Sequence, residues 1–140
     1  MELPAWDKAL RVDGGPLDLQ HQHLLALTTL IAEKAKAGDA SEAKRLFQLL
    51  YQDCLQHFSD EEAFMATIAY PHRDEHQREH QRLLTHVQLR LYDSASDPAG
   101  VNLVAIMDCL RSLVIMHILN DDMEIGGFIK RVDDRHTASP

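Results

Sequence analysis

Apolar residues recur every three or four positions in four long stretches of this sequence, and that spacing places them on one face of an α-helix. In the second stretch, for example, Leu46, Leu50, Cys54, Met65 and Ile68 fall on one stripe. No stretch alternates apolar and polar residues as a half-buried strand does. The pattern predicts four helices, over residues 18–37, 41–69, 71–92 and 100–120.

Helix-breaking residues separate these stretches. Gly38 follows the first one, and residues 93–100 form a loop by their content of Ser, Asp, Pro and Gly. Pro71 suits the first turn of the third helix, because its missing N–H costs nothing there and its fixed φ is already helical. We therefore expect short connections between neighbouring helices.

Both ends of the chain are predicted to lie outside the four helices. Prolines and glycines among residues 1–17 exclude a long helix, so we expect an extended arm there, with Trp6 packed on the helices. Gly126-Gly127 is expected to break the chain after the fourth helix. That would leave residues 121–140 as a short terminal segment and a polar tail.

Four amphipathic helices with short connections favour an all-α fold, an up-down-up-down four-helix bundle with an extended N-terminal arm. The chain has 140 residues, of which 45% are hydrophobic, so it can bury one core and is too short for two. We predict a single domain over residues 1–140. The bundle interior is a usual place for metal sites built from facing helices.

Composition narrows the classes of partner and compartment. A formal net charge of -8 without a basic patch argues against binding to nucleic acid or to an anionic membrane. The sequence has neither a signal peptide at its start nor an apolar run long enough to span a bilayer, so we expect a cytoplasmic protein. Cys54 and Cys109 lie within apolar helical patterns, which favours reduced, buried thiols.

Nine histidines are the unusual feature of the composition, and several have the spacing of metal ligands. His57 and Glu61 are four residues apart in the second helix, and His76 and His80 are four apart in the third. That spacing puts both members of a pair on one helix face. Imidazole and carboxylate together suit iron or zinc, so the two pairs predict a metal centre between these helices.

The other two helices also carry candidates. The first offers His21 and His23 on nearly opposite faces, the third also offers His72, and the fourth carries His117, followed by Asp122. The five-residue step from His117 to Asp122 does not align on an ideal α-helix, so it needs a helix distortion or a helix end between the two residues.

One ligand set draws on all four helices and contains five imidazoles and two carboxylates. Burying so many polar groups without partners costs several kcal/mol, on the order of the transfer penalties of such groups, and a metal offsets that cost. The set is too large for one zinc and suits two irons that share bridging carboxylates and a bridging oxygen. Its members are His21, His57, Glu61, His76, His80, His117 and Asp122.

With these residues in place, the whole chain resembles the hemerythrins, specifically the single-domain bacterial kind. The resemblance covers the Trp6 arm, Asp18-Leu-Gln-His21, His57-Phe-Ser-Asp-Glu61, Tyr70-Pro71 followed by His76 and His80, and His117 to Asp122. It implies a four-helix bundle around two iron ions, a non-haem di-iron centre with an oxo or hydroxo bridge. It also implies O2 as the ligand of that centre.

The resemblance further implies a role for each candidate. The family's Asp-x-x-His pattern selects His21, and the five-residue step from Pro71 selects His76 with His80. His76, His80 and His117 would hold one iron, His21 and His57 the other, which keeps a vacant position, with Glu61 and Asp122 bridging. His72 would then be a surface residue in the first turn of the third helix, and Glu62 would face solvent or a polar partner outside the ligand set. The other three histidines would be solvated or structural: His23, His86 and His136.

The predicted function is reversible O2 binding for carriage, storage or delivery, by a protein that is not an enzyme. Di-iron oxidases and peroxidases use carboxylate-rich sites, whereas this set is rich in histidine. The alternative is an oxygen-sensing or redox-sensing domain of a signalling protein, such as a diguanylate cyclase or chemoreceptor, with an output domain as partner. Residues 133–140 fit either a natural tail or a linker.

The chain departs from the family's usual pattern before His117. The family usually has Trp-Leu four and three residues before this histidine, where this chain has Leu113 and Val114. A smaller side chain leaves a larger or wetter space near the centre, which predicts faster autoxidation of the oxygenated form. The alternative is simple repacking, with Leu113 as an ordinary core residue.

Overall fold

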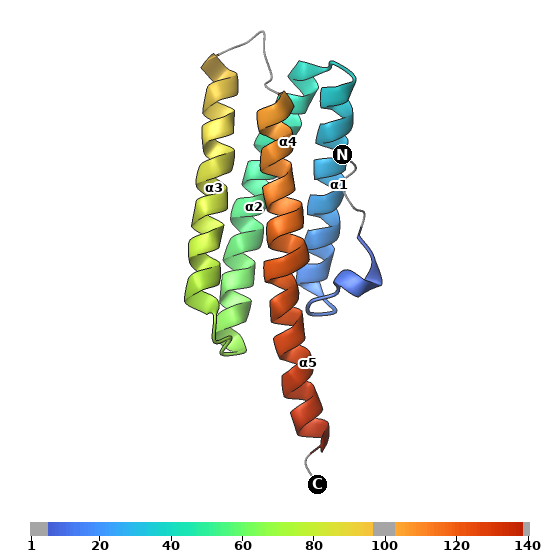
Figure 1. Ribbon diagram of the computed structural model, residues 1–140, viewed down its shortest axis with the longest axis vertical. Helices are drawn as coiled ribbons and strands as arrows, with labels where there is room; N and C mark the ends of the chain where they lie inside the picture. Colours follow the sequence, from blue (N-terminus) through green and yellow to red (C-terminus); the bar gives the residue numbers. More distant parts are fainter. Residues whose placement is uncertain (1–5, 97–102, 139–140) are drawn as a thin grey trace.

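The computed structural model of the chain describes residues 6–96 and 103–138, and all its regular structure in these ranges is helical. The described helices form four rods. The first three rods are the single helices α1, α2 and α3, and the fourth is a continuous helix made of α4, the π-helical segment η2 and α5 (Figure 1). The all-α bundle is thus confirmed. The bounds are α1 Pro16–Lys36, α2 Ala40–Thr67, α3 Arg73–Ser96, α4 Leu103–Arg111, η2 Ser112–Asp122 and α5 Met123–Ala138.

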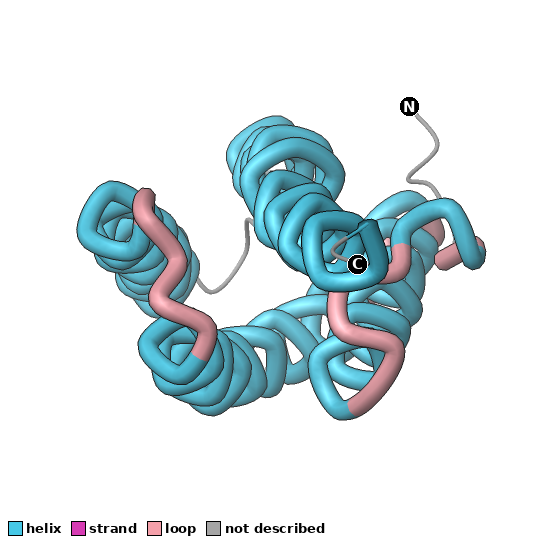
Figure 2. Tube along the Cα trace, turned by 90° about the horizontal axis from the view of Figure 1, so that it is seen from below, coloured by secondary structure: helices cyan, strands magenta, loops and turns pink. Residues whose placement is uncertain are grey.

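The helices run alternately up and down, and sequence neighbours pack side by side. Helix α1 contacts α2, α2 contacts α3, α3 contacts α4, and α4 returns to contact α1, which closes the bundle. Seen along its length, the bundle surrounds a common interior (Figure 2). The fourth rod is longer than the others, and α5 extends past them at the lower end (Figure 1). None of the helices in the described ranges has the length and apolar character needed to cross a membrane.

The helix starts differ from the sequence-based expectation by a few residues. Helix α1 begins at Pro16, two residues before the expected Asp18. Helix α3 begins at Arg73, so Pro71 is not in its first turn. Pro71 instead takes the second position of a turn that the Arg73 N–H closes by donating to the Tyr70 carbonyl over 3.3 Å, a position where the fixed φ of proline is equally suitable.

The prediction that the fourth helix ends at residue 120, before a terminal segment and tail, is wrong. The chain stays helical from Leu103 to Ala138 and passes through Gly126-Gly127 without a break. Each glycine costs a helix about 1 kcal/mol relative to alanine. Packing offsets that cost, since Ile125 is fully buried against Met65 and Tyr70 at this end of the bundle.

The N-terminal arm is fastened to this end of the bundle. Its described part contains one 3-10 turn, η1 (Lys8–Leu10), and bends at residues 12–15 before α1, and Trp6 packs against the main core as expected. The buried Asp18 carboxylate accepts hydrogen bonds from the backbone N–H groups of Val12 (2.7 Å) and Gly14 (2.8 Å). Asp18 therefore holds the arm rather than starting the helix.

The buried apolar residues form two clusters along the bundle. The larger one fills the interior from the α1–α2 connection to Phe58 and Ile118, and it includes Cys54 and Cys109, which are buried free thiols as predicted. The smaller one, at the arm end, is built from Val12, Met65, Tyr70 and Ile125. A layer of polar side chains from all four rods lies between the two clusters.

The two adjacent glycines of α5 give a matched test of this packing. A Cβ atom on Gly126 would lie 3.2 Å from the Arg11 carbonyl oxygen and 3.3 Å from Val12 Cα, so the arm backbone has to move. A Cβ on Gly127 meets only the flexible end of Arg131. We expect Gly127→Ala to raise the free energy of unfolding by up to about 1 kcal/mol through helix propensity, and Gly126→Ala to lose that gain. Equal urea midpoints for the two variants would contradict the close packing of the arm.

Candidate metal centre

The polar layer contains all seven residues of the predicted ligand set. Helix α1 supplies His21, α2 supplies His57 and Glu61, α3 supplies His76 and His80, and η2 supplies His117 and Asp122. Every one of these side chains is buried, and their ligating atoms lie within 4.8 Å of one another in two overlapping groups. The fold thus brings the whole set together.

Two of the pairs meet because of ordinary α-helical geometry. The four-residue step in α2 places His57 Nε2 at 3.4 Å from Glu61 Oε2. The same step in α3 places the His76 and His80 rings with their centroids 4.6 Å apart, nearly perpendicular to each other. Side chains four residues apart share a helix face, and here both faces are turned to the interior.

The five-residue step from His117 to Asp122 is accommodated by a change of helix type. Residues Ser112–Asp122 form a π-helix, whose backbone hydrogen bonds join residues five apart, so His117 and Asp122 lie on one face. Their Nε2 and Oδ1 atoms are 3.0 Å apart. Of the two alternatives left open by the sequence, the helix distortion is correct and the helix end is not.

Three histidines form one side of the site. His80 Nε2 lies 3.1 Å from His117 Nε2, and His76 Nε2 lies 3.0 Å from Asp122 Oδ1. The Oε1 atom of Glu61 faces this group, at 2.6 Å from His76 Nε2 and 2.9 Å from His80 Nε2. One oxygen of each carboxylate therefore points to the three-histidine group.

Two histidines form the other side. His21 Nε2 and His57 Nε2 are 3.1 Å apart. The second oxygen of each carboxylate faces them, since Asp122 Oδ2 lies 3.0 Å and Glu61 Oε2 lies 3.5 Å from His21 Nε2. Glu61 and Asp122 thus turn one oxygen to each group, which is the arrangement a bridging carboxylate requires.

These spacings fit a metal better than they fit a polar core. With metal–ligand bonds of about 2.1 Å, adjacent ligand atoms of an octahedral site lie about 3.0 Å apart, close to the distances observed here. Several buried atoms of the cluster have no hydrogen bond of good geometry within the described residues: Glu61 Oε2, both carboxylate oxygens of Asp122, His21 Nδ1 and His117 Nδ1. The cluster can therefore bind metal. The role of each residue as a ligand stays a prediction.

The sequence profile of the hemerythrin HHE cation binding domain matches residues 16–129, which include all seven residues. The chain belongs to the hemerythrin family. It is also similar to bacteriohemerythrins of Campylobacter jejuni subsp. jejuni, those of serotype O:23/36 (strain 81-176) and of serotype O:2 (strain ATCC 700819 / NCTC 11168), at 29% identity over 83 residues in each case. The alignment covers 59% of this chain and 62% of each relative.

The electrostatics of this hemerythrin domain without metal follow from burial and close opposite charges. Burial alone would lower the pKa of His21, but the carboxylates of Asp122 and Glu61 outweigh it and raise that pKa to about 10. The same balance raises the pKa of His76 to about 9 and that of His117 to about 10. Burial would raise the pKa of both carboxyl groups, yet the surrounding imidazoles hold them well below their usual range.

A second layer of polar residues contacts the outer nitrogens of the histidines, and sequence reasoning missed two of its members. His57 Nδ1 lies 2.7 Å from Gln20 Oε1, and His117 Nδ1 lies 3.4 Å from Asp121 Oδ2. Their positions directly beside His21 and Asp122 in the sequence were the only signal. Glu62, which was expected to face solvent or a polar partner, lies with Oε2 3.2 Å from His80 Nδ1.

An aromatic ring separates the site from the main core. Phe58 is buried and stacks on the His80 ring, with centroids 4.0 Å apart and planes within 6°. It also meets the edge of the His117 ring at 5.4 Å. Phe58 therefore fixes the planes of two imidazoles while keeping water from their apolar side.

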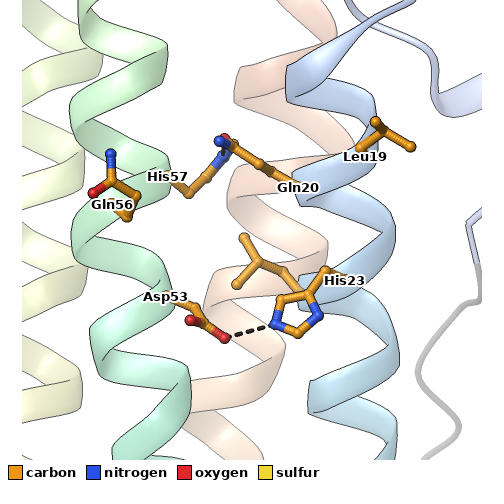
Figure 3. Close-up of a pocket in the computed structure, with 7 residues that line it drawn as sticks. Leu19, Gln20, His23, Asp53, Gln56 and His57 are labelled. Atoms are coloured by element: carbon orange, nitrogen blue, oxygen red, sulfur yellow. Dashed lines mark hydrogen bonds and ion pairs between the residues drawn. The ribbon is translucent and has the colours of Figure 1, made fainter.

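The remaining histidines lie away from the centre or outside the described side chains. His23 is largely exposed and pairs with Asp53 over 2.6 Å (Figure 3). His72 is exposed in the turn before α3, 3.8 Å from Glu75. His86 is half-buried, and the side chain of His136 lies outside the described part of the chain.

The raised histidine pKa values predict how the metal-free protein responds to pH. Stability contributed by a protonated imidazole is full below its ordinary pKa of 6.5 and is lost as the pH rises to about 10, because the buried carboxylates then lose their counter-charges. We expect the urea midpoint of the metal-free protein to fall between pH 6.5 and pH 9.5. In Asp122→Asn the fall should be smaller, since one of the charges that raise these pKa values is absent. A midpoint independent of pH would contradict the assignment.

Proposed function

We propose that this hemerythrin domain binds O2 reversibly at a non-haem di-iron centre and serves in the carriage, storage or delivery of oxygen in the cytoplasm. The observation that carries the proposal is the division of the site into a three-histidine and a two-histidine group, joined by two carboxylates that face both. That division supports two adjoining metal positions. The similarity to bacteriohemerythrins supports iron as the metal.

The residues would be divided unequally between the two ions. His76, His80 and His117 would hold one iron, His21 and His57 the other, and Glu61 and Asp122 would bridge them. The position with two histidines has one protein ligand fewer, which leaves room for a small molecule. Two ferrous ions, when bound, would supply the electrons that O2 accepts on binding. They would recover these electrons when O2 leaves.

The protein's own part is to hold the ligands, limit the charge and exclude water. The two carboxylates offset part of the positive charge of two ions, while the five imidazoles add none when neutral. All seven side chains are buried, and Phe58 closes the core side of the layer where it stacks on His80. A water-poor site rich in histidine favours reversible binding over oxidation of a substrate, so we propose a binding protein rather than an enzyme.

The proposal is tested by the absorption spectrum of the iron-loaded, reduced protein before air is admitted, in air, and after air is removed. We expect two irons per chain and a visible charge-transfer band that comes and goes with O2. His21→Ala should bind less iron and lose the band, whereas the matched variant His23→Ala, on the outer side of the same helix, should keep both. A band that stays after O2 is removed would count against reversible binding, and a protein that binds no iron would overturn the site.

A sensory role is the second candidate, and the shape of the fourth rod favours it. Asp122 ends η2, and α5 continues from it without a break to beyond the bundle. A change at the centre could therefore reach the surface through one continuous helix, where an output domain would receive it.

The sensory candidate predicts a change outside the centre. Amide hydrogen exchange of residues 128–135 should differ between the reduced form without O2 and the oxygenated form, while exchange in the middle of α1 stays the same. Identical exchange in α5 in both forms would favour a carrier.

Leu113 is fully buried in the main core, and its effect on the centre remains a prediction. If the smaller side chain admits water near the site, the oxygenated form of Leu113→Trp should autoxidise several-fold more slowly, with Leu113→Phe in between. The larger side chains are expected to cost about 1–3 kcal/mol of stability through overpacking. An autoxidation rate that is the same in all three proteins would favour simple repacking.

A further inference from the structure

A chain of side-chain hydrogen bonds leads outward from His57 across the groove between α1 and α2. The His57 Nδ1 atom lies 2.7 Å from Gln20 Oε1, and Gln20 Nε2 donates to Asp60 Oδ2 over 2.7 Å. Gln56 Nε2 donates to the other oxygen of Asp60 over 2.8 Å. Figure 3 shows Gln20 and His57 reaching toward each other from α1 and α2, with Gln56 nearby.

This chain fixes the position of a proton on His57. An ionised Asp60 carboxylate can only accept, so the Gln20 amide must turn its NH2 group to Asp60 and its carbonyl oxygen to His57. A carbonyl oxygen also only accepts, so His57 Nδ1 must carry the hydrogen. The lone pair of the neutral ring is then on Nε2, which faces Glu61 and His21 in the centre.

We propose that Gln20 is a positioning residue for the two-histidine metal position, acting through His57. It selects the tautomer that can ligate and holds the plane of the ring, with Asp60 orienting Gln20 in turn. The inference rests on the proposed metal centre and deepens it, because it names the residue outside the ligand set that sets the affinity of one metal position.

The two sides of the centre differ in this outer layer. In the three-histidine group, His80 and His117 face carboxylates, Glu62 and Asp121, at 3.2 and 3.4 Å. In the two-histidine group, His57 faces a neutral amide, and His21 Nδ1 is buried without a hydrogen-bond partner among the described residues. In the two-histidine position Gln20 supplies the only such outer hydrogen bond among the described residues. In the other position Glu62 supplies one to His80, while the contact of His117 with Asp121 lacks hydrogen-bond geometry.

The surroundings of Gln20 explain why its amide matters. Gln20 and His57 form part of the wall of an open cavity of about 250 Å³ between α1 and α2, lined also by Leu19, Leu24, His23 and Gln56. Water from this cavity can replace a lost carbonyl, but water both donates and accepts and so selects neither tautomer. Removal of such an outer contact typically lowers metal affinity about 10- to 100-fold, and partial replacement by water points to the lower end of that range.

The test is a Co²⁺ titration of the metal-free protein in competition with a chelator, which separates two binding steps. Gln20→Leu should weaken the second step about 10-fold and leave the first unchanged. Gln56→Leu is the matched control, since it removes the same kind of amide from the same cavity two hydrogen bonds farther out, and both its steps should equal those of the unmodified protein. If Gln20→Leu leaves both steps unchanged, the inference is overturned.

A second readout follows the proton itself. In the zinc-loaded protein, ¹H–¹⁵N correlation spectra should show the His57 Nδ1 hydrogen protected from exchange with solvent, and Gln20→Leu should lose this signal while keeping that of His80. The double variant Gln20→Glu with Asp60→Asn should restore both the signal and the second binding step. In this double variant, the carboxylate introduced by Gln20→Glu accepts hydrogen bonds from His57 Nδ1–H and from the NH2 group introduced by Asp60→Asn. The carbonyl oxygen of the introduced amide accepts a hydrogen bond from Gln56.

The outcomes separate this inference from the metal centre on which it rests. Two Co²⁺ steps in the unmodified protein with no effect of Gln20→Leu would remove only the role of Gln20. The role of Gln20 would also be contradicted if the double variant had the urea midpoint of the unmodified protein but did not recover the second binding step. A single step, or none, in the unmodified protein would overturn the two-metal centre itself.

Discussion

The structure depends on one constraint, the burial of five imidazoles and two carboxylates within a single layer of the bundle. In the absence of a metal, protonated imidazoles supply the positive charge that the two buried carboxylates need, and burying so many charged groups in a low-dielectric interior is costly. Atoms that converge on a point need supports on every side, so each of the four rods supplies at least one of them. The backbone has adapted to this requirement: a π-helix places Asp122 in line with His117, although such helices are rare and less regular than α-helices.

The fold and part of the candidate site could be predicted from the sequence, because the apolar and ligand-type residues recur with the period of an α-helix. The apolar stripes and the four-residue steps of His57–Glu61 and His76–His80 follow directly from α-helical geometry, and the bundle and both pairs are as predicted. The five-residue step could not be decided in advance, since a helix end and a π-helix satisfy it equally. Local propensity misled at Gly126-Gly127, where packing of Ile125 and of the arm outweighs the cost of glycine in a helix. Gln20 escaped notice because its contact crosses from α1 to α2, and no periodic pattern records such a contact.

The fourth rod combines three tasks in one continuous element. Its α4 part completes the apolar core, η2 presents two residues to the centre, and the start of α5 accepts the N-terminal arm at Gly126. The arm is held from the other side by Asp18, three residues before His21 on α1. The arm therefore contacts both rods that carry His21, His117 and Asp122, and these contacts lie at the same end of the bundle. Changes in the arm and changes in the centre are mechanically connected through short stretches of helix.

The polar layer also divides the apolar interior, which lies in a large cluster on one side and a small one around Met65 and Ile125 on the other. Apolar contact normally makes a bundle unfold as one unit, and here that contact is interrupted across the whole cross-section. Without metal, the arm end is kept folded by its small cluster, the Asp18 contacts and the imidazole–carboxylate pairs of the polar layer, so we expect it to be a weaker cooperative unit than the main core. Metal ligated from both α2 and η2 would join the two units into one. In this fold the ions would act as a structural joint as well as a binding site.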